Sequence, residues 1–195
     1  MLTATHTLIA DTLRSFIGER TGVFLKKKHF RYGCIKPDLV PKLISVPHYF
    51  SESFAFVMEE AGRLYEMNFS KKKSFAKFCE RLGVIVHYLS DFFCTAHNSP
   101  AYDNLGRHVT YEAYLAGLFE KMKNEGKPLS KNPHFSVPRD IQSFVLLSHE
   151  RYLALPFTKE NDYLFSLGVC AGVCIKIVEE LILPLAENGA KAEAS

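Results

Sequence analysis

Apolar residues recur at helical spacing along most of this chain, and no segment alternates apolar and polar residues over the length of a strand. The periodicity predicts about six helices, over residues 3–18, 51–68, 70–94, 108–123, 138–154 and 159–185. Residues 22–46 contain several Gly and Pro residues and are predicted to be a loop with room for one short helix. Because no repeat or linker divides the chain, we expect an all-α fold: a single compact multi-helix bundle over residues 1–188, followed by a disordered tail at 189–195.

Composition and charge narrow the possible partners and the compartment. Apolar residues make up 47% of the chain, which favours a packed core, and the net charge of +3 is too small to indicate a specific nucleic-acid partner. The five cysteines are odd in number and form no C-x-x-C pair, so reduced thiols are expected. The longest apolar stretch, residues 165–175, is too short to span a bilayer, and the N-terminus lacks the features of a signal peptide. We therefore expect a cytoplasmic protein with no transmembrane segment.

The segment HYLSDFFCTAHN carries the first candidate chemistry. His87 and Asp91 are four residues apart in a predicted helix, so both side chains project from one face and can hold one metal ion. His97 lies six residues beyond Asp91, off that face, and is expected past the end of the helix beside a neighbouring ion.

A second pair and three isolated residues extend this set. His108 and Glu112 again stand four apart, a suitable two-pronged arm for zinc that His97 would complete. Asp38 and His48 lie ten residues apart in the early loop, each beside a proline, and His6 lies in the first helix. Singly, each is most simply a hydrogen-bonded structural residue, but five of the eight histidines join three carboxylates in one ordered series. The other three, His29, His134 and His149, are interpreted as structural.

The order H-x3-D-x5-H-N followed by H-x3-E resembles the zinc-dependent phospholipase C family, whose architecture is shared with zinc-dependent single-strand nucleases. The resemblance covers residues 6–112 and includes Asp38, the His48-Tyr49-Phe50 segment and His6. It implies a metal-dependent hydrolase of a small-molecule or lipid phosphate ester, using water activated by two or three zinc ions.

The resemblance also implies the role of each residue. Asp38, His48, His87 and Asp91 would hold the first zinc, Asp91 would bridge to a second that also uses His6, and the last zinc would use the residues His97, His108 and Glu112. As a separate mechanistic hypothesis, Asp38 would orient or deprotonate the attacking water wherever the metal does not fully engage its carboxylate, with Glu112 as the second candidate for this role.

Three departures from the family pattern leave alternatives open. The secreted relatives bind one zinc through an N-terminal Trp, whereas this chain has no Trp, so Met1 or water would have to complete that site. The aromatic residues that enclose choline are replaced by Leu39 and Ser45, and Thr95-Ala96 stands where a Pro is usual. A nuclease or nucleotide phosphatase of the same fold, and a non-catalytic module stabilised by zinc, are therefore the alternative hypotheses.

Overall fold

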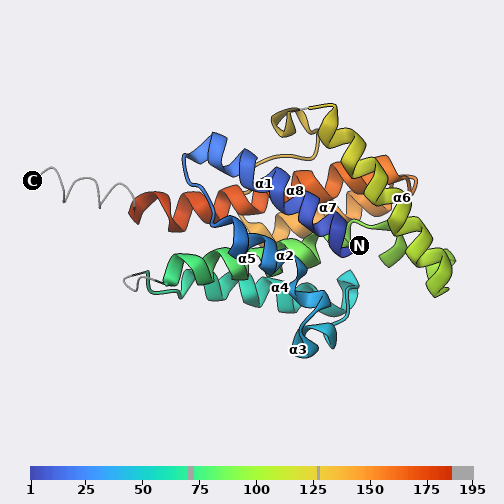
Figure 1. The fold of residues 1–195 in the computed structure, drawn as a ribbon, viewed down its shortest axis with the longest axis horizontal. Coiled ribbons are helices and arrows are strands. Elements are labelled where there is room, and N and C mark those ends of the chain that lie inside the picture. The colour runs from blue at the N-terminus through green and yellow to red at the C-terminus, as the bar shows by residue number, and fades with distance from the viewer. Residues whose placement is uncertain (70–72, 127, 186–195) are drawn as a thin grey trace, which may run out of the picture.

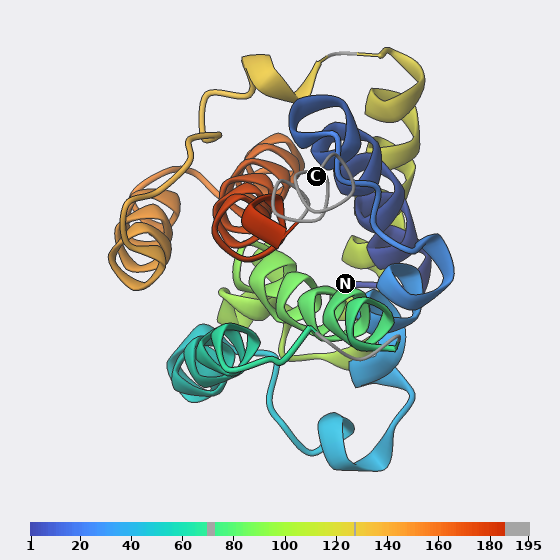
Figure 2. The same ribbon diagram turned by 90° about the vertical axis from the view of Figure 1, so that its left-hand side faces the viewer.

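A computed structural model describes residues 1–69, 73–126 and 128–185, and this part of the chain is a helical bundle without strands (Figures 1 and 2). The predicted all-α fold is confirmed. The α-helices are α1 (Thr3–Thr21), α2 (Lys27–Ile35), α3 (Pro41–Ile44), α4 (Phe50–Tyr65), α5 (Ser74–Phe92), α6 (Leu105–Asn124), α7 (Ile141–Leu153) and α8 (Lys159–Leu181). Short 3-10 turns are η1 (Lys36–Asp38), η2 (Thr95–His97), η3 (Pro100–Tyr102) and η4 (Leu129–Lys131). Within the described ranges, none of these helices combines the length and apolar character that a bilayer crossing requires.

The segment 22–46, predicted as a loop with room for one short helix, is more helical than expected. It contains a full helix, α2, followed by η1 and the four-residue helix α3, which projects from the bundle (Figure 1). The buried face of α2 consists only of Phe30, Gly33 and Cys34. This face is too small to give a clear helical pattern next to the basic residues 26–28.

Helix ends are set by capping residues that the apolar pattern does not reveal. The Asn104 side chain accepts hydrogen bonds from the N–H groups of Gly106 and Arg107, so α6 begins one turn earlier than predicted. Asp140 caps α7 through the N–H of Ser143, which places Pro138 before the helix rather than in its first turn. The predicted start of α5 near residue 70 and the predicted tail at 189–195 lie outside the described residues.

The close approach of α2 to α5 fixes the part of the bundle that matters most for function. Gly33 and Gly83 face each other there: a Cβ on Gly83 would lie 2.5 Å from the Phe30 carbonyl oxygen, and one on Gly33 would overlap the Glu80 carbonyl. The backbones can therefore approach closely only because both residues are glycine. One turn after Gly83, His87 donates a hydrogen bond from Nδ1 to the Cys34 carbonyl at 2.8 Å, which ties the two helices together beside the candidate ligands.

Substitution of Gly83 by Ala should destabilise the protein by about 1–3 kcal/mol, because the added methyl group must push α2 away from α5. Gly62→Ala is the matched control: this glycine is exposed in α4 with nothing within 4 Å, so the change should stabilise the protein by about 0.5–1 kcal/mol. Urea unfolding of both variants measures these free energies. Equal effects of the two substitutions would contradict the close-packing interpretation.

Candidate metal centre

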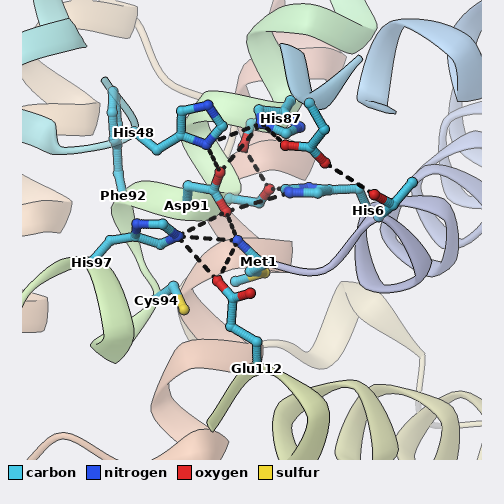
Figure 3. A network of polar contacts seen from close by, with 12 residues as sticks. Met1, His6, His48, His87, Asp91, Phe92, Cys94, His97 and Glu112 are labelled. Atoms are coloured by element: carbon cyan, nitrogen blue, oxygen red, sulfur yellow. Dashed lines mark hydrogen bonds and ion pairs between the residues drawn. The ribbon is translucent and has the colours of Figure 1, made fainter. Parts of the chain in front are cut away.

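Asp91 lies at the centre of the candidate site, and α5 places it there together with His87. Both side chains are fully buried, and they project from the same face of the helix, as the spacing predicted (Figure 3). The Nε2 atom of His87 lies 3.3 Å from Asp91 Oδ2. The two oxygens of Asp91 face different sets of side chains, so one carboxylate can serve two neighbouring ions.

The first set surrounds Asp91 Oδ2 and comes from the segment between α2 and α4. His48 Nδ1 lies 2.9 Å from this oxygen. Asp38, at the end of η1, places Oδ1 3.6 Å from His87 Nε2. Donor atoms of Asp38, His48 and His87 all lie within 4.8 Å of one another, which is compatible with one shared ion. These residues were predicted to share one ion, and the structure brings them together.

The second set surrounds Asp91 Oδ1 and comes from the beginning of the chain. His6, buried in α1, places Nε2 3.4 Å from this oxygen. The amino group of Met1 lies 2.5 Å from the same oxygen. His6, His87 and Asp91 form a second group of donors within 4.8 Å of one another. The family resemblance predicted that an N-terminal residue would complete the ion site that uses His6, and the Met1 amino group lies at that position.

The third set consists of His97, His108 and Glu112, and it lies next to the Met1 amino group. Glu112 Oε1 lies 2.9 Å from His108 Nε2 and 3.3 Å from His97 Nε2. It also lies 3.0 Å from the Met1 nitrogen, which is 3.1 Å from His97 Nε2. His97 belongs to η2, beyond the end of α5, as its spacing from Asp91 predicted.

The tautomers of His6 and His87 show that these sets suit a cation. His87 Nδ1 faces a carbonyl and must carry the proton, which leaves a lone pair on Nε2. The Ser90 hydroxyl donates its hydrogen to the His87 carbonyl at 2.8 Å. The Ser90 oxygen must therefore accept from His6 Nδ1, which lies 3.2 Å away. With the proton on Nδ1, His6 Nε2 is also unprotonated. His6 Nε2 is buried without a hydrogen-bond partner among the described residues. Lone pairs aimed at carboxylate oxygens repel unless a cation lies between them, and zinc favours such nitrogen and oxygen donors.

Comparison with known families agrees with this geometry. The sequence model of the zinc-dependent phospholipase C family matches residues 5–159, most of the chain. The chain belongs to the zinc-dependent phospholipase C family. It is accordingly a phosphoric diester hydrolase of the zinc-dependent class. No curated protein and no solved structure gives a significant match.

Three buried histidines among these candidate donors, His6, His87 and His97, favour the neutral form that can bind metal. Burial lowers the pKa of His87 to about 3 and lowers the pKa values of His6 and His97 as well. Burial alone would raise the pKa of Asp91, but the positive charge of the Met1 ammonium holds it well below its usual value. Without metal, therefore, ionised Asp91 lies beside the neutral imidazoles of His6, His87 and His97.

The Met1 amino group behaves differently from the imidazoles. Burial would lower its pKa, but the negative charges around it, Asp91 first among them, raise it to about 11. In a chain that begins at Met1 this group is therefore an ammonium in the metal-free site, and it must lose a proton before it can act as a ligand.

Asp162, in α8, anchors the segments that carry the third set. Its buried carboxylate accepts hydrogen bonds from the Thr95 N–H (2.8 Å), the Thr95 hydroxyl (2.8 Å) and the Tyr111 hydroxyl (2.9 Å). Thr95 is two residues before His97, and Tyr111 directly precedes Glu112. One carboxylate therefore fixes both η2 and α6, although it is not itself near an ion site. This role could not be predicted from the sequence, because nothing in the α8 pattern distinguishes Asp162 from a helix-start carboxylate.

Two clefts flank the third set. One, of about 590 Å³, is lined by Tyr49, Phe50, His97 and His149, among others. The other, of about 650 Å³, is lined by Tyr102, Tyr111 and Tyr114 with parts of η3 and α6.

His149 has a closer relation to the site than the sequence indicated. Its ring stacks on Phe50 with centroids 3.8 Å apart, and its Nε2 lies 3.0 Å from the Asn98 side-chain oxygen, next to His97. It has no ligand role in the three sets, but it lines the cleft beside His97. His29 is exposed and His134 stacks on Phe165, both away from the metal centre.

The metal-free protein should lose stability as the pH falls below about 6.5. The folded-state pKa of His87 is about 3, below the value of about 6.5 in an unfolded chain, so the unfolded chain binds more protons across that window. Each such histidine contributes a slope of about 1.4 kcal/mol per pH unit. Urea unfolding of chelator-treated protein at pH 7, 6 and 5 measures it.

The variant His87→Gln should reduce this slope, with the exposed His29→Gln as the matched control. A free energy of unfolding that stays constant from pH 7 to pH 5 would contradict the burial of neutral imidazoles in the centre.

Proposed function

We propose that this chain cleaves the phosphodiester bond of a phospholipid or a related head-group ester, using two or three zinc ions. The observation that carries the proposal is the placement of Asp91, whose two oxygens face separate sets of donors. Asp38, His48, His87 and Asp91 are proposed to hold the first ion, and Asp91, His6 and the Met1 amino group the second. The third ion is assigned to the residues His97, His108 and Glu112.

Zinc, when bound, lowers the pKa of a water molecule to about 7 and neutralises charge on phosphoryl oxygens. The chain's own residues supply orientation and proton transfer. Asp38 is the better candidate for the proton acceptor because burial raises its pKa, and Thr3 donates to its Oδ2 at 3.2 Å. Its side chain is 24% exposed, so water can reach it.

Glu112 is less suited to accept a proton. Burial would raise its pKa, but hydrogen bonds from His97 and the Met1 amino group lower it to about 2. Its Oε1 is surrounded by His97, His108 and the Met1 nitrogen. We therefore assign Glu112 to metal binding alone, and Asp38 both to the first ion, through the oxygen that faces His87, and to the proton transfer, through the oxygen that Thr3 contacts.

The surroundings favour a lipid or small ester over a nucleic acid. The cleft beside His97 combines aromatic Tyr49 and Phe50 with the carboxylates of Glu52 and Asp103. Carboxylates repel the phosphates of a polynucleotide, and a nuclease needs a basic approach surface. The exposure of His48 and His108, each 20%, favours a catalytic site over a closed structural one.

The reaction should appear as zinc-dependent release of nitrophenol from bis-nitrophenyl phosphate and of a phosphorylated head group from phosphatidylcholine micelles. Chelator should abolish both, and added zinc should restore them. Single-stranded DNA and 3′-nucleotides serve as comparison substrates. Preferential turnover of these would favour the nuclease, and no turnover by metal-loaded protein on any substrate would contradict the catalytic proposal.

The variant Asp38→Asn should lower kcat by about 10²–10⁴-fold, since it removes the proton acceptor and one anionic donor. Asp11→Asn, in α1 and outside all three sets, is the matched control and should leave kcat unchanged. Zinc content measured on both proteins separates loss of metal from loss of proton transfer. Full activity of Asp38→Asn would remove Asp38 from the mechanism.

Removal of metal should lower the melting temperature strongly, because several carboxylates and imidazoles would then crowd in the bundle interior without a cation. Thermal unfolding of zinc-loaded and verified metal-free protein at pH 7 measures the difference. An unchanged melting temperature would argue against metal ions in the core of the bundle.

A further inference from the structure

Cys94 is the one member of the centre that neither the sequence pattern nor the assigned ligand sets include. It lies between Asp91 and His97, three residues from each, at the point where α5 gives way to η2. Its Sγ atom, a nitrogen of His97 and a carboxylate oxygen of Glu112 all lie within 4.8 Å of one another. Figure 3 shows its sulfur beside the Glu112 carboxylate.

The backbone around Cys94 holds this position firmly. The Cys94 N–H donates to the Asp91 carbonyl at 3.1 Å, and the Cys94 carbonyl accepts from the His97 N–H at 2.9 Å. The Asn98 side chain adds a second hydrogen bond to that carbonyl at 2.8 Å. The turn that presents His97 therefore also fixes the direction of the Cys94 side chain.

The surroundings of the other buried cysteines explain why only Cys94 is singled out. Cys79 Sγ accepts a hydrogen bond from the Lys26 N–H at 3.3 Å, and Cys170 Sγ donates to the Val86 carbonyl at 3.7 Å. The sulfurs of Cys34, Cys94 and Cys174 form no hydrogen bond within the part of the chain that the structure describes, so burial and the lack of a hydrogen bond do not by themselves distinguish Cys94. Among the described cysteines, only Cys94 belongs to a group of candidate metal donors.

We propose that Cys94 binds, as a thiolate, the ion held by His97 and Glu112. This inference rests on the proposed function, because it requires that the third set binds metal at all. A metal ion deprotonates a coordinating thiol, and Zn²⁺ accepts cysteine sulfur, histidine nitrogen and carboxylate oxygen as ligands. On binding, the sulfur–metal bond forms as the thiol proton leaves to solvent, with no oxidation or reduction.

A thiolate changes what this third site can do. Together with Glu112 it supplies two negative charges, which neutralise a divalent cation. The sulfur donor also favours softer ions, such as zinc, over magnesium or manganese. We therefore infer that the third site contributes less positive charge to phosphate binding than the two sites that share Asp91.

The test is the absorption spectrum of the full chain titrated with Co²⁺ after chelator treatment, together with the number of ions bound. Coordination by Cys94 predicts a cobalt–thiolate charge-transfer band in the near ultraviolet. Cys94→Ser should lose the band and bind the ion of this site about tenfold or more weakly. Cys79→Ser is the matched control, a buried cysteine outside the three sets, and should retain both the band and the affinity.

The outcomes separate this inference from the function on which it rests. Binding of two or three Co²⁺ ions without the band, or with a band that persists in Cys94→Ser, overturns the Cys94 assignment and leaves the proposed function standing. Absence of Co²⁺ binding overturns both. If Cys94→Ser does not fold, Cys94→Ala takes its place, and the presence or absence of the band in the unmodified protein decides by itself.

Discussion

The structure depends on one buried carboxylate. Asp91 is fully enclosed in the bundle, and a buried charge costs several kcal/mol unless it is compensated. The described residues around it provide the amino group of Met1 and imidazole nitrogens of four histidines, but no lysine or arginine side chain. The Met1 ammonium supplies a compensating positive charge in the metal-free protein, and divalent cations would balance the carboxylate more completely.

Outer contacts keep the donors around Asp91 in position. The glycine contact between α2 and α5 lets the Cys34 carbonyl reach His87, and Ser90 fixes the ring of His6 in the same way. On the opposite side, Asp162 holds η2 and α6 so that His97 and Glu112 face each other. The Cys34 carbonyl, Ser90 and Asp162 orient the candidate ligands, and the first two also set the tautomers of His87 and His6. Outer contacts of this kind typically affect metal affinity by about 10–100-fold.

The ligand pairs could be predicted from sequence, because helical spacing alone places His87 with Asp91 and His108 with Glu112. The isolated residues His6, Asp38 and His48 could be assigned only through the family resemblance, since no periodicity connects them. Spacing gave no sign of Cys94 or Asp162, because their roles depend on where η2 packs against α6 and α8. Likewise, the extent of α2 could not be predicted, because its contact with α5 is made partly through Gly33, which adds no apolar side chain to the short buried face of Phe30 and Cys34.

The most direct test of the account is an anomalous difference map from crystals of the zinc-loaded protein, measured at the zinc absorption edge. We expect two neighbouring peaks about 3.5–4 Å apart, one on each side of the Asp91 carboxylate, and a further peak among the donors of His97, His108 and Glu112. Zinc bound only at the molecular surface, with Asp91 contacting protein groups alone, would contradict it.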